Sequence, residues 1–383
     1  MVSAALPESP VAVASVKART RPWHIHGPFF DSFWIIGMPL LALGLIVAFC
    51  LPRVPGQSIL GGIGTTPPLL LFFAGCATYT HINITVARIY MNKQVFRRFP
   101  KRLVLAPVFA FTILAINPNL LTILIVVALL WDEYHSFMQT FGFARIYDSK
   151  LGNDPATGRY VDMVACFVLE WLPYLVAVTF AAPDFHDIMN VGPEYYLRRR
   201  ARFVPPELLQ APLVLFAMGF LIFYVGYWAQ KAKEGYRVSK AKIGILASTG
   251  IANWVLVTHY TLIEGGAMAN IYHGLQYIAI IWVSERMNLT QVLHTKKLKY
   301  AGIWIAFIAI AIPSLLFAAL RTNGSFVLAI FGEGIATTHP TLYSVLSFFK
   351  EMPSILFAFW ATTSLLHYWV DGFVWSVRKN EAV

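Results

Sequence analysis

Long apolar runs alternate with short polar segments along the chain, a pattern typical of proteins that cross a bilayer several times. A helix needs roughly 20 apolar residues to span the hydrocarbon core. The pattern therefore predicts an all-α fold, a polytopic transmembrane helical bundle of about ten helices. The predicted segments lie near residues 33–52, 64–90, 102–117, 119–145, 161–182, 210–230, 242–260, 262–285, 300–320 and 352–377.

Basic residues are concentrated in alternate loops, at residues 93–102, 231–242 and 286–299. Two predicted turns between them, Asn117–Asn119 and Gly265-Gly266, carry no basic residue. Because cytoplasmic loops are enriched in Lys and Arg, both termini are predicted to be cytoplasmic. One arginine-rich loop, residues 198–202, falls on the outer side in this topology.

The predicted organisation is a single transmembrane domain with short flanking segments. Residues 1–30 form a flexible cytoplasmic arm with an interfacial anchor, residues 31–378 form the helical domain, and residues 379–383 form a cytoplasmic tail. No low-complexity tract or domain linker follows the arm.

The composition agrees with a membrane protein and excludes an ordinary soluble one. Hydrophobic residues make up 57% of the 383 residues and charged residues only 13%, too few to cover a soluble surface. The net charge of +11 is explained by the positive-inside topology and anionic lipid, so nucleic acid is not expected as a partner. The three cysteines lie in apolar runs without CxxC spacing, which argues against a disulfide framework.

Four histidines in predicted membrane segments lie at the same distance from the cytoplasmic side. They precede the first cytoplasmic cation of their loops by 10 to 13 residues, which corresponds to about 15–20 Å along a helix. They are His81, His135, His273 and His367. Glu170 reaches a similar level from the opposite chain direction, and Asp371 follows His367 by one helical turn.

Ionisable groups in a bilayer are costly, so several of them at one level indicate a shared polar site. A single membrane histidine is more often a hydrogen-bond partner between helices than a ligand. The joint pattern favours a metal ion bound by the four histidines, because imidazole is the commonest nitrogen ligand and buried carboxylates supply negative charge. Asp371 and Glu170 are the further predicted metal ligands, and Glu133 is a carboxylate ligand or bridge.

A short internal repeat supports the choice of the residues around the ligands. Asp132-Glu133-Tyr134-His135 with Gln139 is echoed by Asn270-Ile271-Tyr272-His273 with Gln276. Asp132, Gln139, Asn270 and Gln276 are predicted to orient the metal ligands from outside. Glu133, Tyr134 and Tyr272 are the predicted catalytic residues.

Two other polar positions have open interpretations. Arg88 is expected to extend its side chain to the cytoplasmic interface, or else to hold an anionic head group. His259 and Glu264 lie near the outer end of a predicted hairpin, where they form a proton-carrying pair or cap the turn.

Four motifs give the chain a resemblance to known membrane proteins. They are THxxxTxxR from Thr80, YHxxxQxxGFxRxY from Tyr134, YHxxQY from Tyr272 and HYxxDxxxW from His367. With them the chain resembles a sparsely characterised family of bacterial polytopic membrane proteins, which implies the bacterial inner membrane as its location. More loosely, it is similar to histidine-rich integral-membrane di-iron oxygenases and desaturases, although it has no HxxxH or HxxHH box.

These observations predict an oxygen-dependent membrane oxidoreductase that hydroxylates, desaturates or cleaves a lipophilic substrate. The expected cofactor is iron, as two ions, with copper as the alternative, and a separate protein is expected to donate electrons. Two other hypotheses remain open at this stage: a haem-binding electron-transfer protein and a proton-coupled transporter. The sequence does not indicate the oligomeric state.

Overall fold

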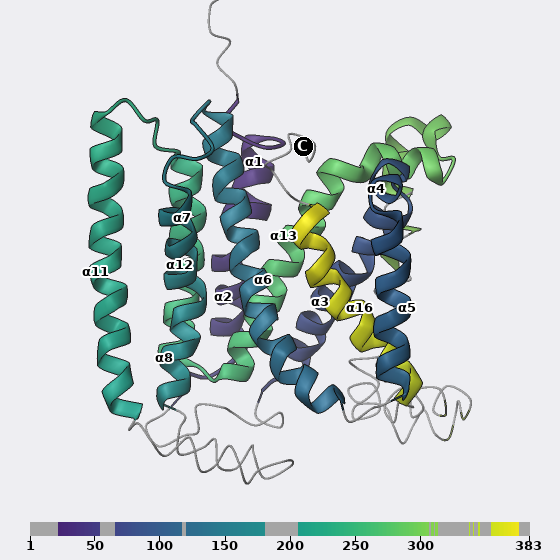
Figure 1. Ribbon diagram of the computed structural model, residues 1–383, viewed down its shortest axis with the longest axis horizontal. Helices are drawn as coiled ribbons and strands as arrows, with labels where there is room; N and C mark the ends of the chain where they lie inside the picture. The colour runs from purple at the N-terminus through teal and green to yellow at the C-terminus, as the bar shows by residue number, and fades with distance from the viewer. Residues whose placement is uncertain are drawn as a thin grey trace, which may run out of the picture.

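The computed structural model describes residues 22–53, 66–116, 120–180, 206–305 and 354–374, with isolated positions between residues 308 and 344. Within these residues every regular element is helical (Figure 1). The long helices are α2 (Met38–Phe49), α3 (Pro68–Tyr90), α5 (Pro100–Ile116), α6 (Leu120–Lys150), α11 (Pro206–Lys233), α12 (Lys240–His259), α13 (Leu262–Val292) and α16 (Ser354–Val374). The shorter elements are α1 (Pro28–Phe30), η1 (Asp31–Ile36), α4 (Lys93–Arg98), α7 (Arg159–Cys166), η2 (Phe167–Trp171), α8 (Leu172–Phe180) and η4 (Lys296–Leu298).

The predicted apolar segments coincide with helices, except for residues 300–320, most of which lie outside the described residues. The predicted turn at Asn117–Asn119 also lies outside them. Among the described helices, four are long and apolar enough to cross a membrane. The bent pair formed by Pro28–Ile36 and Met38–Phe49 makes a possible fifth span. The all-α prediction is therefore confirmed, whereas the ten-span count is supported only as four to five candidate spans.

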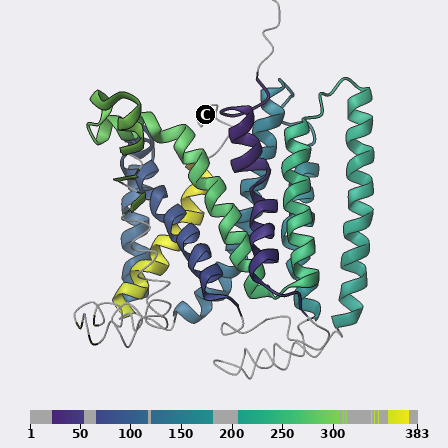
Figure 2. The same ribbon diagram turned by 180° about the vertical axis from the view of Figure 1, so that it is seen from behind.

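The helices run side by side, and α3, α6, α13 and α16 run in the same chain direction (Figures 1 and 2). The segments with the basic residues, at α4, between α11 and α12, and after α13, lie together at the upper end of the bundle in Figure 1. The predicted topology placed these basic segments on the same, cytoplasmic side of the membrane, and their position at one end of the bundle agrees with it.

The predicted turn at Gly265-Gly266 is wrong. The chain turns at Tyr260 and Thr261 instead, and α13 begins at Leu262. Thr261 and Glu264 form a reciprocal capping box that satisfies the first N–H groups of α13. This settles the interpretation of Glu264, which caps the helix. The missing Cβ of Gly265 makes room for Leu256, whose Cδ2 would lie 2.4 Å from it.

Helices α3 and α13 pack closely because small residues face each other. A Cβ on Gly274 would lie 2.9 Å from the backbone oxygen of Ala77, closer than real atoms approach. Gly274 follows His273 directly, and Ala77 precedes His81 by one turn. The close contact therefore brings two of the predicted ligands together.

Arg88 adopts neither of its predicted conformations. Its guanidinium is buried and forms an ion pair with Glu285 of α13, and it also donates to the hydroxyl of Ser284. Asn92 donates to the same carboxylate. Arg88 therefore joins α3 to α13 inside the protein. A buried cation is stabilised by an opposite charge, and the buried Glu285 supplies that charge.

Candidate metal centre

The four predicted histidines form one buried group. Each offers a ring nitrogen, and these atoms all lie within 4.8 Å of one another. None of the four residues is more than 7% exposed. The ring centroids of neighbouring imidazoles are 4.6 to 5.1 Å apart, and the rings meet edge to face. The four side chains come one each from α3, α6, α13 and α16. Together they form the histidine group.

Most ring nitrogens of the group have no hydrogen-bond partner among the described residues. This holds for Nε2 of His81, His135 and His367 and for both ring nitrogens of His273. Buried polar atoms are nearly always paired. Four buried histidines with unpartnered nitrogens, whose ligand atoms lie within 4.8 Å of one another, could therefore hold a metal ion.

Two of the rings are oriented by partners on their outer nitrogen. Nδ1 of His81 lies 3.3 Å from the backbone oxygen of Ala77, and Nδ1 of His367 lies 2.8 Å from Oγ1 of Thr85. A hydrogen on Nδ1 would satisfy both contacts and would leave Nε2 as an electron-pair donor. Metal-bound histidines characteristically use this arrangement, because the outer partner fixes the tautomer.

A second polar layer lies one helical turn after the histidines on all four helices. Each histidine is followed four residues later by a polar side chain, on the same helix face. These residues are Thr85, Gln139, Tyr277 and Asp371. The spacing is visible in the sequence, but only Gln139 and Asp371 were predicted from it.

Three members of this second layer are joined by hydrogen bonds. The hydroxyls of Thr85 and Tyr277 are 2.9 Å apart, and Tyr277 donates to Oδ1 of Asp371 at 3.1 Å. The other oxygen of Asp371 lies 3.7 Å from Nε2 of both His135 and His367. The predicted ligand Asp371 thus lies against the histidine group without belonging to the set of mutually close ligand atoms.

Glu170 does not belong to the histidine group, and its carboxylate is hydrogen-bonded to two of the helices that carry the ligands, α6 and α13. Its carboxylate accepts hydrogen bonds from Tyr272 at 3.0 Å, from Thr140 at 2.8 Å and from Ser136. Ser136 follows His135 and Tyr272 precedes His273, so this contact fixes α6 against α13 beside their ligands. Glu170 is positioned by the π-helical turn η2, an irregularity that is common at functional sites.

The two echoed glutamines contact each other. Gln139 donates to Oε1 of Gln276 at 3.2 Å and to the backbone oxygen of His273 at 3.1 Å. Gln276 in turn donates to the backbone oxygen of Ile35 at 2.7 Å. The repeat in the sequence therefore corresponds to a contact between α6 and α13 next to the ligands, and neither amide binds an imidazole nitrogen of His273.

The remaining predicted residues surround the group at greater distance or face away from it. Asp132 hydrogen-bonds Tyr368, whose ring lies 5.2 Å from that of His135. One carboxylate oxygen of Glu133 is buried without a partner among the described residues. Tyr134 is 46% exposed and so faces the outside of the bundle. Asn270 was expected to hold the ring of His273, but no described residue hydrogen-bonds either nitrogen of that ring.

The spacing within the histidine group is close to that of ligands around a metal ion. Metal–nitrogen bonds to histidine are about 2.0–2.1 Å long, so ligand atoms on opposite sides of one ion are about 4 Å apart. The ligand atoms of the histidine group all lie within 4.8 Å of one another, which is close to that separation. Among the described residues, these four histidines are the only set of three or more potential ligands whose ligand atoms lie this close together.

Comparison with known proteins gives no match for this chain, whether against protein-family models, curated proteins or solved structures.

Proposed function

We propose that this protein is an integral-membrane metalloenzyme in which His81, His135, His273 and His367 bind one metal ion and support oxidation of a lipophilic substrate by dioxygen. The convergence of unpartnered, buried imidazole nitrogens within 4.8 Å carries the proposal. The candidate membrane spans support a location in a membrane, which we propose to be the bacterial inner membrane.

The geometry favours one ion over the two expected from the resemblance to di-iron enzymes. A two-ion site holds its ions about 3.5–4 Å apart and needs ligands for both of them. The carboxylate of Glu170, a predicted ligand, instead accepts three hydroxyl hydrogen bonds. Asp371 is the one predicted carboxylate ligand that lies beside the histidine nitrogens.

Iron is the proposed ion and copper is the alternative, because imidazole ligands suit both metals. Four neutral imidazoles add no charge to the ion, so nearby carboxylates must balance it. Asp371 lies beside the histidine nitrogens, Glu133 is partly buried on α6 and Glu170 is buried on η2. When bound, an ion with four histidine ligands and open positions supplies dioxygen activation.

The residues of the second layer would position the ligands and hold protons. Thr85 fixes the ring of His367, and the chain of hydroxyls from Thr85 through Tyr277 ends on the carboxylate of Asp371. This chain connects a ligand ring to a carboxylate through groups that both donate and accept hydrogen bonds. It provides a path for protons between the site and Asp371. Reducing equivalents would come from a separate electron donor.

The two competing hypotheses are less consistent with this geometry. A haem supplies four equatorial nitrogens of its own and uses at most two axial histidines. Four imidazoles gathered around one point leave no space for the porphyrin ring. A proton-coupled transporter would use histidines that exchange protons along a path, whereas here the four imidazoles are gathered within 4.8 Å, with Asp371 as the carboxylate beside them.

Metal analysis of the purified protein tests the proposal. We expect one equivalent of iron per chain in the wild-type protein and background metal in His135→Ala and His273→Ala, since each substitution removes one of four ligands. His259→Ala is the matched control, because His259 is an exposed histidine at the end of α12. Equal metal content in all four proteins would refute the proposal.

A further inference from the structure

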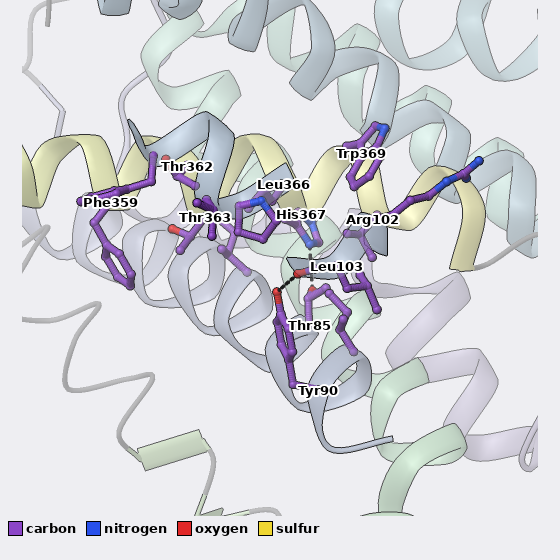
Figure 3. A pocket seen from close by; sticks show the side chains of 16 residues that line it. Thr85, Tyr90, Arg102, Leu103, Phe359, Thr362, Thr363, Leu366, His367 and Trp369 are labelled. Carbon is purple, nitrogen blue, oxygen red and sulfur yellow. Dashed lines mark hydrogen bonds between the residues drawn. The ribbon is translucent and has the colours of Figure 1, made fainter. Parts of the chain in front are cut away.

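A cavity of about 450 Å³ lies between α3, α5 and α16, directly beside the histidine group (Figure 3). Its volume is in the range of small-molecule sites. One wall is formed by His367, one of the four proposed ligands, and by Thr85, which hydrogen-bonds that ring. The cavity therefore reaches the histidine group at the ring of His367.

The walls of the cavity are almost entirely apolar. Helix α3 contributes Ile82 and Ile89, α5 contributes Leu103, Val108 and Phe111, and α16 contributes Phe359, Leu366 and Val370. The lining extends along α16 from Phe359 to Val370, past His367 (Figure 3). At 1.5 Å per residue this span corresponds to about 16 Å, so the cavity is elongated.

Besides Nε2 of His367, one buried polar side-chain atom in the lining lacks a hydrogen-bond partner among the described residues. Oγ1 of Thr362 is buried and has no hydrogen-bond partner among the described residues, and Thr362 is only 4% exposed. A buried hydroxyl without a partner costs stability. A ligand with one hydrogen-bonding oxygen at this point would satisfy it.

We propose that this cavity binds the lipophilic substrate, as an elongated, mostly hydrocarbon molecule whose single oxygen pairs with Thr362. That the bound molecule is the substrate rests on the proposed function. The hydrocarbon part contacts His367 between the two ends of the cavity. The position that reacts is therefore internal to the chain of the substrate.

Trp369 gives a direct measure of binding, because it lines the cavity. A long-chain fatty alcohol brominated at mid-chain should quench its fluorescence in protein reconstituted in unbrominated phospholipid. The signal is the difference between the wild-type protein and Trp369→Phe, which removes the contribution of the other tryptophans. Equal quenching in both proteins would overturn the inference.

Two variants test the contacts within the cavity. Thr362→Val removes the hydroxyl at nearly constant volume, so we expect about 2- to 10-fold weaker binding of the brominated alcohol and unchanged binding of a brominated alkane of the same length. Val108→Phe narrows the cavity from α5 and should weaken both probes. If Thr362→Val binds the alcohol as tightly as the wild-type protein, the assigned polar contact is wrong.

The same measurement in His135→Ala separates this inference from the metal proposal. His135 does not line the cavity, so quenching of Trp369 should persist in this variant even after metal is lost. Quenching without metal in the wild-type protein would leave the cavity assignment standing and refute the metalloenzyme. Metal binding without quenching of Trp369 would overturn the cavity assignment and leave the metalloenzyme proposal standing.

Discussion

The protein contains two buried polar clusters, which differ in whether their polar groups have partners within the cluster. One is an ionic cluster of Arg145, Asp148, Asp162 and Lys242, which joins α6, α7 and α12. Each of its charges has an opposite charge within 3.4 Å. Tyr224 and Tyr236 donate further hydrogen bonds to the two aspartates.

The histidine group has no such internal balance. Its inner nitrogens face one another and find no donor among the described residues. The ionic cluster contains its own cations and so requires nothing from outside to be stable. The histidine group contains only electron-pair donors on its inner side, with Asp371 beside them. Burial of polar groups is therefore common to both clusters, and the unpartnered nitrogens alone distinguish the one that could hold an ion.

The largest effect is expected from breaking the ionic cluster. Lys242→Met removes one of two cations and leaves two buried carboxylates with Arg145 alone. Loss of one partner from a buried pair costs about 3–5 kcal/mol, so the thermal unfolding midpoint should fall sharply. The metal content of the protein that remains folded should not change, because the ionic cluster supplies no ligand. Lys240→Met, an exposed lysine on the same helix, is the control and should unfold like the wild-type protein.

A smaller effect is expected at the partner of a ligand. Thr85→Val removes the hydroxyl that fixes the ring of His367 while it preserves the shape of the side chain. Loss of such an outer partner typically weakens metal binding by about 10- to 100-fold. Competition with a chelator of known affinity measures the change. Thr85→Ser keeps the hydroxyl and should bind metal as tightly as the wild-type protein; equal affinity in Thr85→Val would remove Thr85 from the metal site.

The smallest effect is expected at the echoed glutamines. Gln139→Met breaks the hydrogen bonds to Gln276 and to the backbone of His273 but leaves every ligand in place. We expect a loss of about 1 kcal/mol in stability, seen as a small decrease of the unfolding midpoint, with one metal ion still bound. Complete loss of metal in this variant would show that the amide acts on the ion directly.

The sequence predicts the histidine group well because the rise of a helix is fixed. Counting residues to the first basic loop residue gave the height of each imidazole, and parallel helices with equal heights brought the four side chains together. Height does not give the direction in which a side chain points around the helix axis. Glu170 was placed at this height by the same count, and its carboxylate accepts hydrogen bonds from three hydroxyls; its role as a ligand stays a prediction.

Other features could not be predicted from the pattern of apolar segments. Asp148, Asp162 and Lys242 lie near helix ends, where charged residues are ordinarily solvated. Arg145 lies in the motif quoted from Tyr134, but the motif does not indicate that its side chain is buried. Thr85 and Tyr277 lie within the quoted motifs, four residues after a histidine, and that spacing could have identified them. The pairing of Arg88 with Glu285 depends on how α3 packs on α13, which one helix alone does not reveal.

X-ray absorption spectroscopy at the metal edge of the purified protein tests the central claim most directly. We expect one ion per chain with about four nitrogen neighbours at about 2.0–2.2 Å and multiple-scattering features of imidazole. A metal neighbour at about 3.5–4 Å would indicate a two-ion site. That result, or a first shell without imidazole, would contradict a single ion held by His81, His135, His273 and His367.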